Sequence, residues 1–189
     1  MSAPVTDHDF DKAYQAPFTL WGDIRIPGEI KKLSSEFRHA AILELGCGIG
    51  RFTSYMAEQG HKATGIDFSS VAIEKAKKRQ QKSAVKADFH VADVTDISFL
   101  PDCYDASFDI GCFHCLSSEK QPFYISSLSK RLKSGAQHLI WAMNKGPSDL
   151  VYSPEYIENL FKEYFTLIQA KKSFRRFAPS HWYYLKRKE

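Results

Sequence analysis

A glycine-rich segment between a short apolar run and a helical pattern constrains this chain more than any other feature. The segment reads Glu44-Leu45-Gly46-Cys47-Gly48-Ile49-Gly50. The apolar run at 41–45 is typical of a buried strand, and the helical pattern at 50–59 ends at Gly60. Glycines permit a tight turn and close approach of a ligand to the backbone, and the following helix offers free N–H groups. This strand–loop–helix unit predicts a ligand site on an α/β fold.

The remaining sequence alternates between strand-like and helix-like segments. Strands are predicted at 41–45, 62–66, 89–92, 108–113, 138–143, 165–170 and 182–186. Helical patterns lie at 27–37, 50–59, 70–81, 122–132 and 154–164. Such alternation predicts an α/β fold with a doubly wound, mostly parallel sheet and helices on both faces. The last two strands are expected to form a hairpin. Ligands then bind outside the carboxyl ends of the strands.

Composition indicates one domain outside the membrane. The chain has 189 residues, 43% of them hydrophobic, which is enough for one core. No run approaches the roughly 20 apolar residues that span a bilayer. Residues 1–10 are polar and acidic, unlike a secretory signal. We therefore expect a cytoplasmic protein without a membrane partner, with an extension at 1–26 and one domain at 27–189.

The four cysteines predict neither disulfides nor a metal site. They are Cys47, Cys103, Cys112 and Cys115. A disulfide scaffold is shorter and richer in cysteine, so reduced thiols are expected. Cys112 and Cys115 form a C-x-x-C pair, but no second pair supplies further zinc ligands. The pair also leaves a predicted strand, whereas redox pairs normally begin a helix.

A basic cluster lies near the end of the chain. Much of the formal charge of +4 comes from Lys171, Lys172, Arg175, Arg176, Lys186, Arg187 and Lys188. Such a cluster can meet an anionic partner. No recognised nucleic-acid module accompanies it, so we interpret it as solvated surface and expect no nucleic-acid partner.

The glycine spacing differs from that of dinucleotide-binding loops. Glycines lie at 46, 48 and 50, an acid stands two residues before the first, and Arg51 replaces the third glycine of the dinucleotide pattern. The segment resembles motif I of class I S-adenosylmethionine-dependent methyltransferases. That resemblance implies a Rossmann-like sheet of seven strands, with one antiparallel strand near the C-terminus.

The same resemblance implies how the cofactor S-adenosylmethionine is held. Asp67, about 20 residues past the glycine loop, would accept hydrogen bonds from both ribose hydroxyls. The simpler interpretation of Asp67 is an acid that stabilises a helix N-terminus. Phe68 would flank the adenine, Asp93 would accept from its amino group, and the Val94 N–H would bond the ring. Glu44 would lie near the amino-acid end, beside Gly46, Cys47 and Gly48.

The predicted fourth strand ends in Asp109-Ile110-Gly111-Cys112-Phe113-His114-Cys115-Leu116. This segment resembles small-molecule methyltransferases of the thiopurine, thiol and halide group, and it lacks the N/D-P-P-Y/F/W motif of DNA amino methyltransferases. The resemblance places Cys112 and Phe113 at the cofactor. His114 is the candidate general base. The alternative is a hydrogen-bonded loop histidine beside the cofactor, because methyl transfer needs alignment more than a base.

Aromatic residues recur near the N-terminus, at Phe10, Tyr14, Phe18 and Trp21. They resemble the segment that folds over the cofactor in thiopurine-type enzymes, which implies a lid in which Tyr14 and Trp21 contact the cofactor. The alternative is that they cap the sheet edge.

The function expected from these features is methyl transfer to a small-molecule nucleophile at sulfur, another chalcogen, nitrogen or oxygen. A monomer or homodimer is expected. Two alternatives stay open, namely an RNA or protein methyltransferase and a non-catalytic S-adenosylmethionine-binding module. Salt-sensitive nucleic-acid binding would favour the first, and binding without turnover would favour the second.

Overall fold

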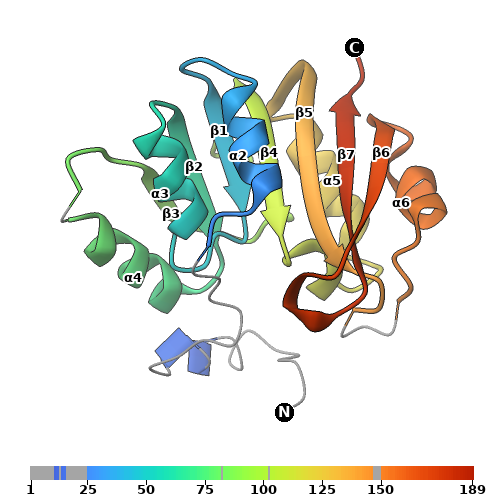
Figure 1. Ribbon diagram of the computed structural model, residues 1–189, viewed down its shortest axis with the longest axis horizontal. Helices are drawn as coiled ribbons and strands as arrows, with labels where there is room; N and C mark the ends of the chain where they lie inside the picture. The colour runs from blue at the N-terminus through green and yellow to red at the C-terminus, as the bar shows by residue number, and fades with distance from the viewer. Residues whose placement is uncertain (1–10, 13, 16–24, 82, 102, 147–149) are drawn as a thin grey trace.

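A seven-stranded sheet with helices on both faces forms the body of the molecule (Figure 1). The computed structural model describes residues 11, 12, 14, 15, 25–81, 83–101, 103–146 and 150–189. The strands are β1 (Ala41–Leu45), β2 (Lys62–Asp67), β3 (Asp88–Val91), β4 (Tyr104–Ile110), β5 (Leu132–Met143), β6 (Phe165–Ser173) and β7 (Ser180–Arg187). The helices are α2 (Gly28–Ser35), α3 (Arg51–Glu58), α4 (Ser70–Gln80), α5 (Gln121–Ser129) and α6 (Pro154–Phe161), with short 3₁₀ turns η1 (Phe113–Cys115) and η2 (Arg175–Phe177).

The sheet order is β3-β2-β1-β4-β5-β7-β6. Strands β1 to β5 pair in parallel, and β7 runs antiparallel to both of its neighbours, β5 and β6. The predicted mostly parallel seven-stranded fold, with its antiparallel strand near the C-terminus, is therefore confirmed. Strand order reverses between β1 and β4, which is where such sheets bind ligands at their carboxyl edge.

The predicted boundaries of β4 and β5 are wrong. β4 starts four residues before the predicted Phe108 and stops at Ile110, because Gly111 has a φ of 93° and a 3₁₀ turn follows it. β5 starts six residues before the predicted His138, and its register against β4 shifts after Tyr104. The C-x-x-C pair therefore spans a turn and does not continue a strand.

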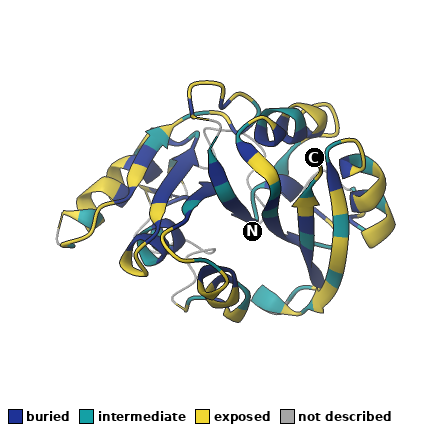
Figure 2. Cartoon of the chain, turned by 90° about the horizontal axis from the view of Figure 1, so that it is seen from above, coloured by how far each residue is buried: buried dark blue, intermediate teal, exposed yellow. Residues whose placement is uncertain are grey.

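Two apolar cores lie on the two faces of the sheet. Helices α2, α3 and α4 cover one face, and α5 and α6 cover the other. Alternation of side chains divides each strand between them, so Phe108 and Trp141 belong to the first core whereas Ile140 belongs to the second. Figure 2 shows the buried strands lying between helices that are exposed on their outer sides.

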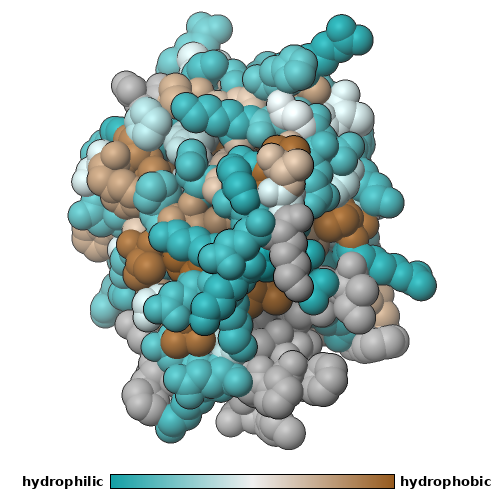
Figure 3. All heavy atoms as spheres, turned by 90° about the vertical axis from the view of Figure 1, so that its left-hand side faces the viewer, coloured by the Kyte–Doolittle hydropathy of each residue, from teal (hydrophilic) through white to brown (hydrophobic). Residues whose placement is uncertain are grey.

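The molecular surface is mainly polar where it can be followed. Hydrophilic side chains cover most of the face in Figure 3, and the apolar areas between them are scattered. Among the described residues, no helix has the length and apolar character needed to cross a membrane.

Replacing Phe161 by alanine should lower the free energy of unfolding by about 3–5 kcal/mol, because it leaves a cavity in the core. The Phe161 ring is fully buried, with centroids 5.3 Å from Phe113 and 5.7 Å from Phe165. Denaturant unfolding measures the change. Phe123→Ala is the control, since that ring on α5 is 65% exposed, and equal losses in both variants would contradict the packing described.

Candidate functional site

The glycine loop lies at the carboxyl edge of the sheet, between β1 and α3. Cys47 donates its backbone N–H to the Ile66 carbonyl at 2.8 Å, which holds the loop against β2. Gly46 has a φ of 67°, and a Cβ atom there would overlap the Cβ of Cys112. The loop therefore lies directly against the outlet of β4 because position 46 has no side chain.

Asp67 ends β2 and ties that strand to the glycine loop. Its carboxylate accepts the backbone N–H of Gly48 at 2.8 Å and that of Ser69 at 2.9 Å. The side chain is 3% exposed, and burial raises its pKa to about 6. Ser69 itself caps α4 by accepting from the Ala72 N–H at 3.1 Å. The helix cap is thus provided by Ser69, and Asp67 faces the loop.

Glu44 is a second buried carboxyl at this edge. It accepts a hydrogen bond from the Thr53 hydroxyl on α3. Burial raises its pKa to about 8, and the nearby charge of Asp67 acts in the same direction. Sequence reasoning missed Thr53, although its place beside Phe52 on the buried side of α3 could have indicated it.

Asp109 is the third buried carboxyl, and it organises the outlet of β4. It accepts the backbone N–H groups of Cys112 and Phe113, each at 2.8 Å, and the Tyr124 hydroxyl at 3.1 Å. Burial raises its pKa to about 7. Tyr124 also lies 3.2 Å from His138 Nε2. A buried polar chain therefore links the outlet to the core, and sequence reasoning did not find it.

The predicted cofactor residues near β3 and β4 lie in different surroundings. Phe113 and Val94 place their side chains in the core, at 0% and 5% exposure. The side chain of Cys112 is half-buried against the glycine loop. Asp93 is exposed and forms an ion pair with Lys120 at 3.4 Å.

Phe68 follows Asp67 and is half-buried. It stands where β2 ends, next to the carboxylate predicted to hold the ribose.

His114 is buried beside the outlet, with 3% exposure. Its ring contacts Trp141 and Tyr152, at centroid distances of 5.8 and 6.4 Å. Burial, and then the charge of Arg176, lower its pKa to about 4, so the ring is neutral at pH 7. Among the described residues, no group hydrogen-bonds to its Nδ1.

The described part of the N-terminal segment docks onto the glycine loop and α4. Tyr14 is 8% exposed, and a Cβ atom on Gly48 would lie 2.8 Å from its hydroxyl. Ser69 donates its hydroxyl to Asp11 at 2.5 Å, and Lys75 donates to the Tyr14 carbonyl. The predicted lid residues Phe10, Phe18 and Trp21 fall outside the described part of the chain.

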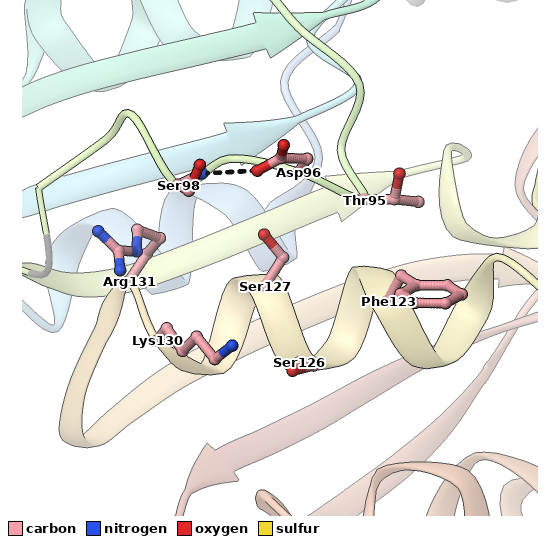
Figure 4. Close-up of a pocket in the computed structure, with 8 residues that line it drawn as sticks. All are labelled: Thr95, Asp96, Ser98, Phe123, Ser126, Ser127, Lys130 and Arg131. Atoms are coloured by element: carbon pink, nitrogen blue, oxygen red, sulfur yellow. Dashed lines mark hydrogen bonds between the residues drawn. The ribbon is translucent and has the colours of Figure 1, made fainter.

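A separate pocket lies between the β3–β4 loop and α5 (Figure 4). Ser127 accepts the Ile97 N–H at 3.0 Å and joins the two elements. Arg131, which precedes β5, lies at one end. None of the predicted cofactor residues lines this pocket.

Metal and thiol chemistry find no support at the outlet. In the described ranges, no group of three or more His, Cys, Asp or Glu side chains could hold a metal ion. Cys115 donates to the Gly111 carbonyl at 3.3 Å, and burial raises its pKa to about 12. A thiol in this state is a poor nucleophile.

Replacing Glu44 by glutamine should stabilise the protein more at high pH than at low pH. The folded pKa of about 8 lies above the unfolded value of 4.5, so the wild type loses stability as pH rises through this window. Between pH 6 and pH 8 the difference between variant and wild type should grow by about 2 kcal/mol. Denaturant unfolding at both pH values measures this difference, and Glu58→Gln is the control at an exposed position. A difference that does not change with pH would contradict the raised pKa of Glu44.

Comparisons with known proteins include several methyltransferases. Residues 42–135 match the family model described as a methyltransferase domain. A 2-heptyl-1-hydroxyquinolin-4(1H)-one methyltransferase of Mycobacteroides abscessus is 28% identical over 148 residues, covering 74% of this chain and 65% of that protein. The chain thus spans just under two thirds of this relative's length.

Two solved structures share the fold. The N-methyltransferase NodS of Bradyrhizobium japonicum, in complex with S-adenosylhomocysteine, has a TM-score of 0.81 at 17% identity, covering 98% of this chain and 100% of that one. The 1,6-didemethyltoxoflavin-N1-methyltransferase of Burkholderia thailandensis has a TM-score of 0.76 at 18% identity, covering 100% and 94%. These matches do not decide the thiopurine, thiol and halide subgroup, which stays a prediction. In sequence over residues 42–135, and in fold, this chain is similar to methyltransferases.

Proposed function

We propose that this protein transfers the methyl group of S-adenosylmethionine to a small-molecule nucleophile. The observation that carries the proposal is the buried Asp67 carboxylate, hydrogen-bonded to the glycine loop at the point where strand order reverses. A carboxylate in this place can accept further hydrogen bonds from vicinal hydroxyls.

The residues at this edge fit S-adenosylmethionine. Glu44, Asp67 and Asp109 are all buried carboxyls whose pKa is raised. A cation beside them would offset the cost of ionising them, and this cofactor carries a sulfonium and an ammonium group. Absence of a Cβ at Gly46 and Gly48 lets Cys112 and Tyr14 pack directly against the loop backbone, so both side chains border the proposed cofactor site.

Each residue then has a defined task toward the cofactor. Asp67 would hold the ribose hydroxyls, and Glu44 would lie toward the amino-acid end. The adenine would lie against Phe68, with Asp93 and the Val94 N–H at its edge. Cys112 would face the reacting carbon. When bound, the cofactor supplies a methyl group activated by the sulfonium.

The acceptor is proposed to be a small molecule with a nucleophilic sulfur, other chalcogen, nitrogen or oxygen atom. Support comes from similar proteins, one of which is named for 2-heptyl-1-hydroxyquinolin-4(1H)-one and another for 1,6-didemethyltoxoflavin. A nucleic-acid partner is not expected.

The N-terminal segment is proposed to cover the cofactor. Support comes from Tyr14, which lies over Gly48, and from the Asp11 contact with Ser69. Such a cover would exclude water from the reacting atoms.

Replacing Asp67 by asparagine should weaken S-adenosylhomocysteine binding about tenfold or more, because charge-assisted hydrogen bonds to the ribose are lost. Isothermal titration calorimetry measures the dissociation constants. Asp96→Asn, an exposed acid on a neighbouring loop, is the control. Unchanged affinity in a folded Asp67→Asn variant would remove the ribose role.

The activity itself is tested by S-adenosylhomocysteine release from the purified chain with thiols, chalcogen anions, heteroaromatic thiols, phenols and amines. Turnover on one class supports the proposal. Cofactor binding without turnover on any class would favour a non-catalytic module or a macromolecular acceptor, and no cofactor binding would end the proposal.

Replacing His114 by asparagine distinguishes a base from a neighbouring residue. A general base should matter for acceptors that must lose a proton, with roughly a 100-fold or larger fall in kcat, and much less for anionic thiolates. Steady-state kinetics on a phenol and a thiolate measure the two effects. An equal fall for both acceptors would assign His114 a structural role.

A further inference from the structure

The turn between β6 and β7 carries two arginines to the carboxyl edge of the sheet. In Figure 1 this turn lies at the lower edge, level with the end of β4. It forms η2 (Arg175–Phe177), in which Arg176 has a φ of 57°. Both arginine side chains are half-buried. The basic cluster seen in the sequence is therefore not all solvated surface.

Arg176 meets two other side chains at one point beside Gly111. The position where a Gly111 Cβ would stand is 3.4 Å from Arg176 Nη1, 3.4 Å from His114 Cε1 and 3.5 Å from Trp141 Cζ3. The guanidinium also lies 5.0 Å from the centroid of the Trp141 ring. A cation over an aromatic face is held in place by the ring's negative surface. A positive group is thus fixed at the outlet of β4.

His114 adds a polar atom that lacks a partner. Its Nδ1 is buried, and nothing within the described ranges hydrogen-bonds to it. Buried polar atoms are normally paired, so a missing partner needs an explanation. A neutral imidazole can donate from one nitrogen and accept at the other. An oxyanion beside Arg176 would provide the acceptor that this nitrogen lacks.

This point borders the proposed cofactor site. Gly111 is followed by Cys112, whose side chain packs against Gly46 of the glycine loop. The buried carboxyls Glu44 and Asp67 lie at the ends of β1 and β2. Carboxyl groups therefore line one part of the edge, and Arg176 lies on the side of β7. Such a distribution suits a cationic cofactor next to an anionic acceptor.

We propose that Arg176, with His114 beside it, binds a carboxylate of the methyl acceptor, so that the acceptors are small organic acids. The inference rests on the proposed function and names its substrate class. Arginine presents a planar fork that matches a carboxylate. In the reaction a lone pair of the nucleophile bonds to the methyl carbon, and the electrons of the broken C–S bond go to sulfur, which leaves as a neutral thioether. The carboxylate stays unchanged throughout.

Matched acid and amide probes test the inference. The pairs are 2-mercaptobenzoate with 2-mercaptobenzamide, and 4-hydroxybenzoate with 4-hydroxybenzamide. Calorimetry on the full chain saturated with S-adenosylhomocysteine gives the dissociation constant of each. Wild type should bind the acid at least about tenfold more tightly than the amide in one pair or both. Arg176→Met should abolish the preference, and Arg176→Lys should restore part of it.

The control is Lys172→Met, which removes one charge from the same hairpin at an exposed position. It should keep the acid preference. Thermal melting and S-adenosylhomocysteine affinity verify that each variant is folded. If Arg176→Met fails to fold, the inference is tested by the acid preference of wild type and by its partial loss in Arg176→Lys.

The inference is overturned if wild type binds acid and amide equally well in every pair, or binds neither. It is also overturned if a folded Arg176→Met variant still prefers the acid. Benzenethiol, a neutral thiol probe, separates this failure from failure of the proposed function. Cofactor binding with methylation of benzenethiol but no acid preference overturns the acid class alone. Failure of the wild type to bind S-adenosylhomocysteine overturns both.

Discussion

The hydrogen bond from the Gly48 N–H to the Asp67 carboxylate is the contact on which the site depends. It joins the loop after β1 to the end of β2, next to the point where strand order reverses between β1 and β4, and it directs a buried acid toward the glycine loop. Burying this carboxylate is costly, since its pKa is raised to about 6. The cost is tolerated because backbone donors from Gly48 and Ser69 satisfy its oxygens. The fold thus holds a carboxyl group with a perturbed pKa in a fixed place, as is common at functional sites.

The sequence predicted the sheet and the glycine loop because both depend on local patterns. Residues 41–50 carry an apolar run, a glycine spacing and a helix start within ten consecutive positions. Asp67 followed from its distance to that loop. The limits of β4 could not be predicted, because Gly111 breaks the strand inside an apolar stretch that continues to Phe113.

Other site features were missed because they depend on tertiary contacts between elements. Thr53 meets Glu44 across a helix–strand interface, and Tyr124 meets Asp109 from α5. Nothing in the local sequence marks the Tyr124 hydroxyl, whereas the place of Thr53 beside Phe52 on the buried side of α3 could have indicated it. Arg176 is the extreme case, because it lies 65 positions after Gly111 in the chain. In the sequence, its segment looks like an ordinary basic surface turn. Phe113 was predicted to contact the cofactor, but its side chain is fully buried in the core.

The position of the β6–β7 turn has a consequence for how such a protein can diversify. Strands β1 to β4 and the glycine loop form one half of the sheet, and the turn at residues 174–179 connects two strands at its other end. Insertion or exchange of residues in this turn would change the surroundings of Gly111 at the carboxyl edge without altering the register of β1 with β2 or β4. The fold therefore separates a part that must stay constant from a part that can vary, and the turn reaches the constant part through Arg176 at Gly111 and Arg175 at Phe52.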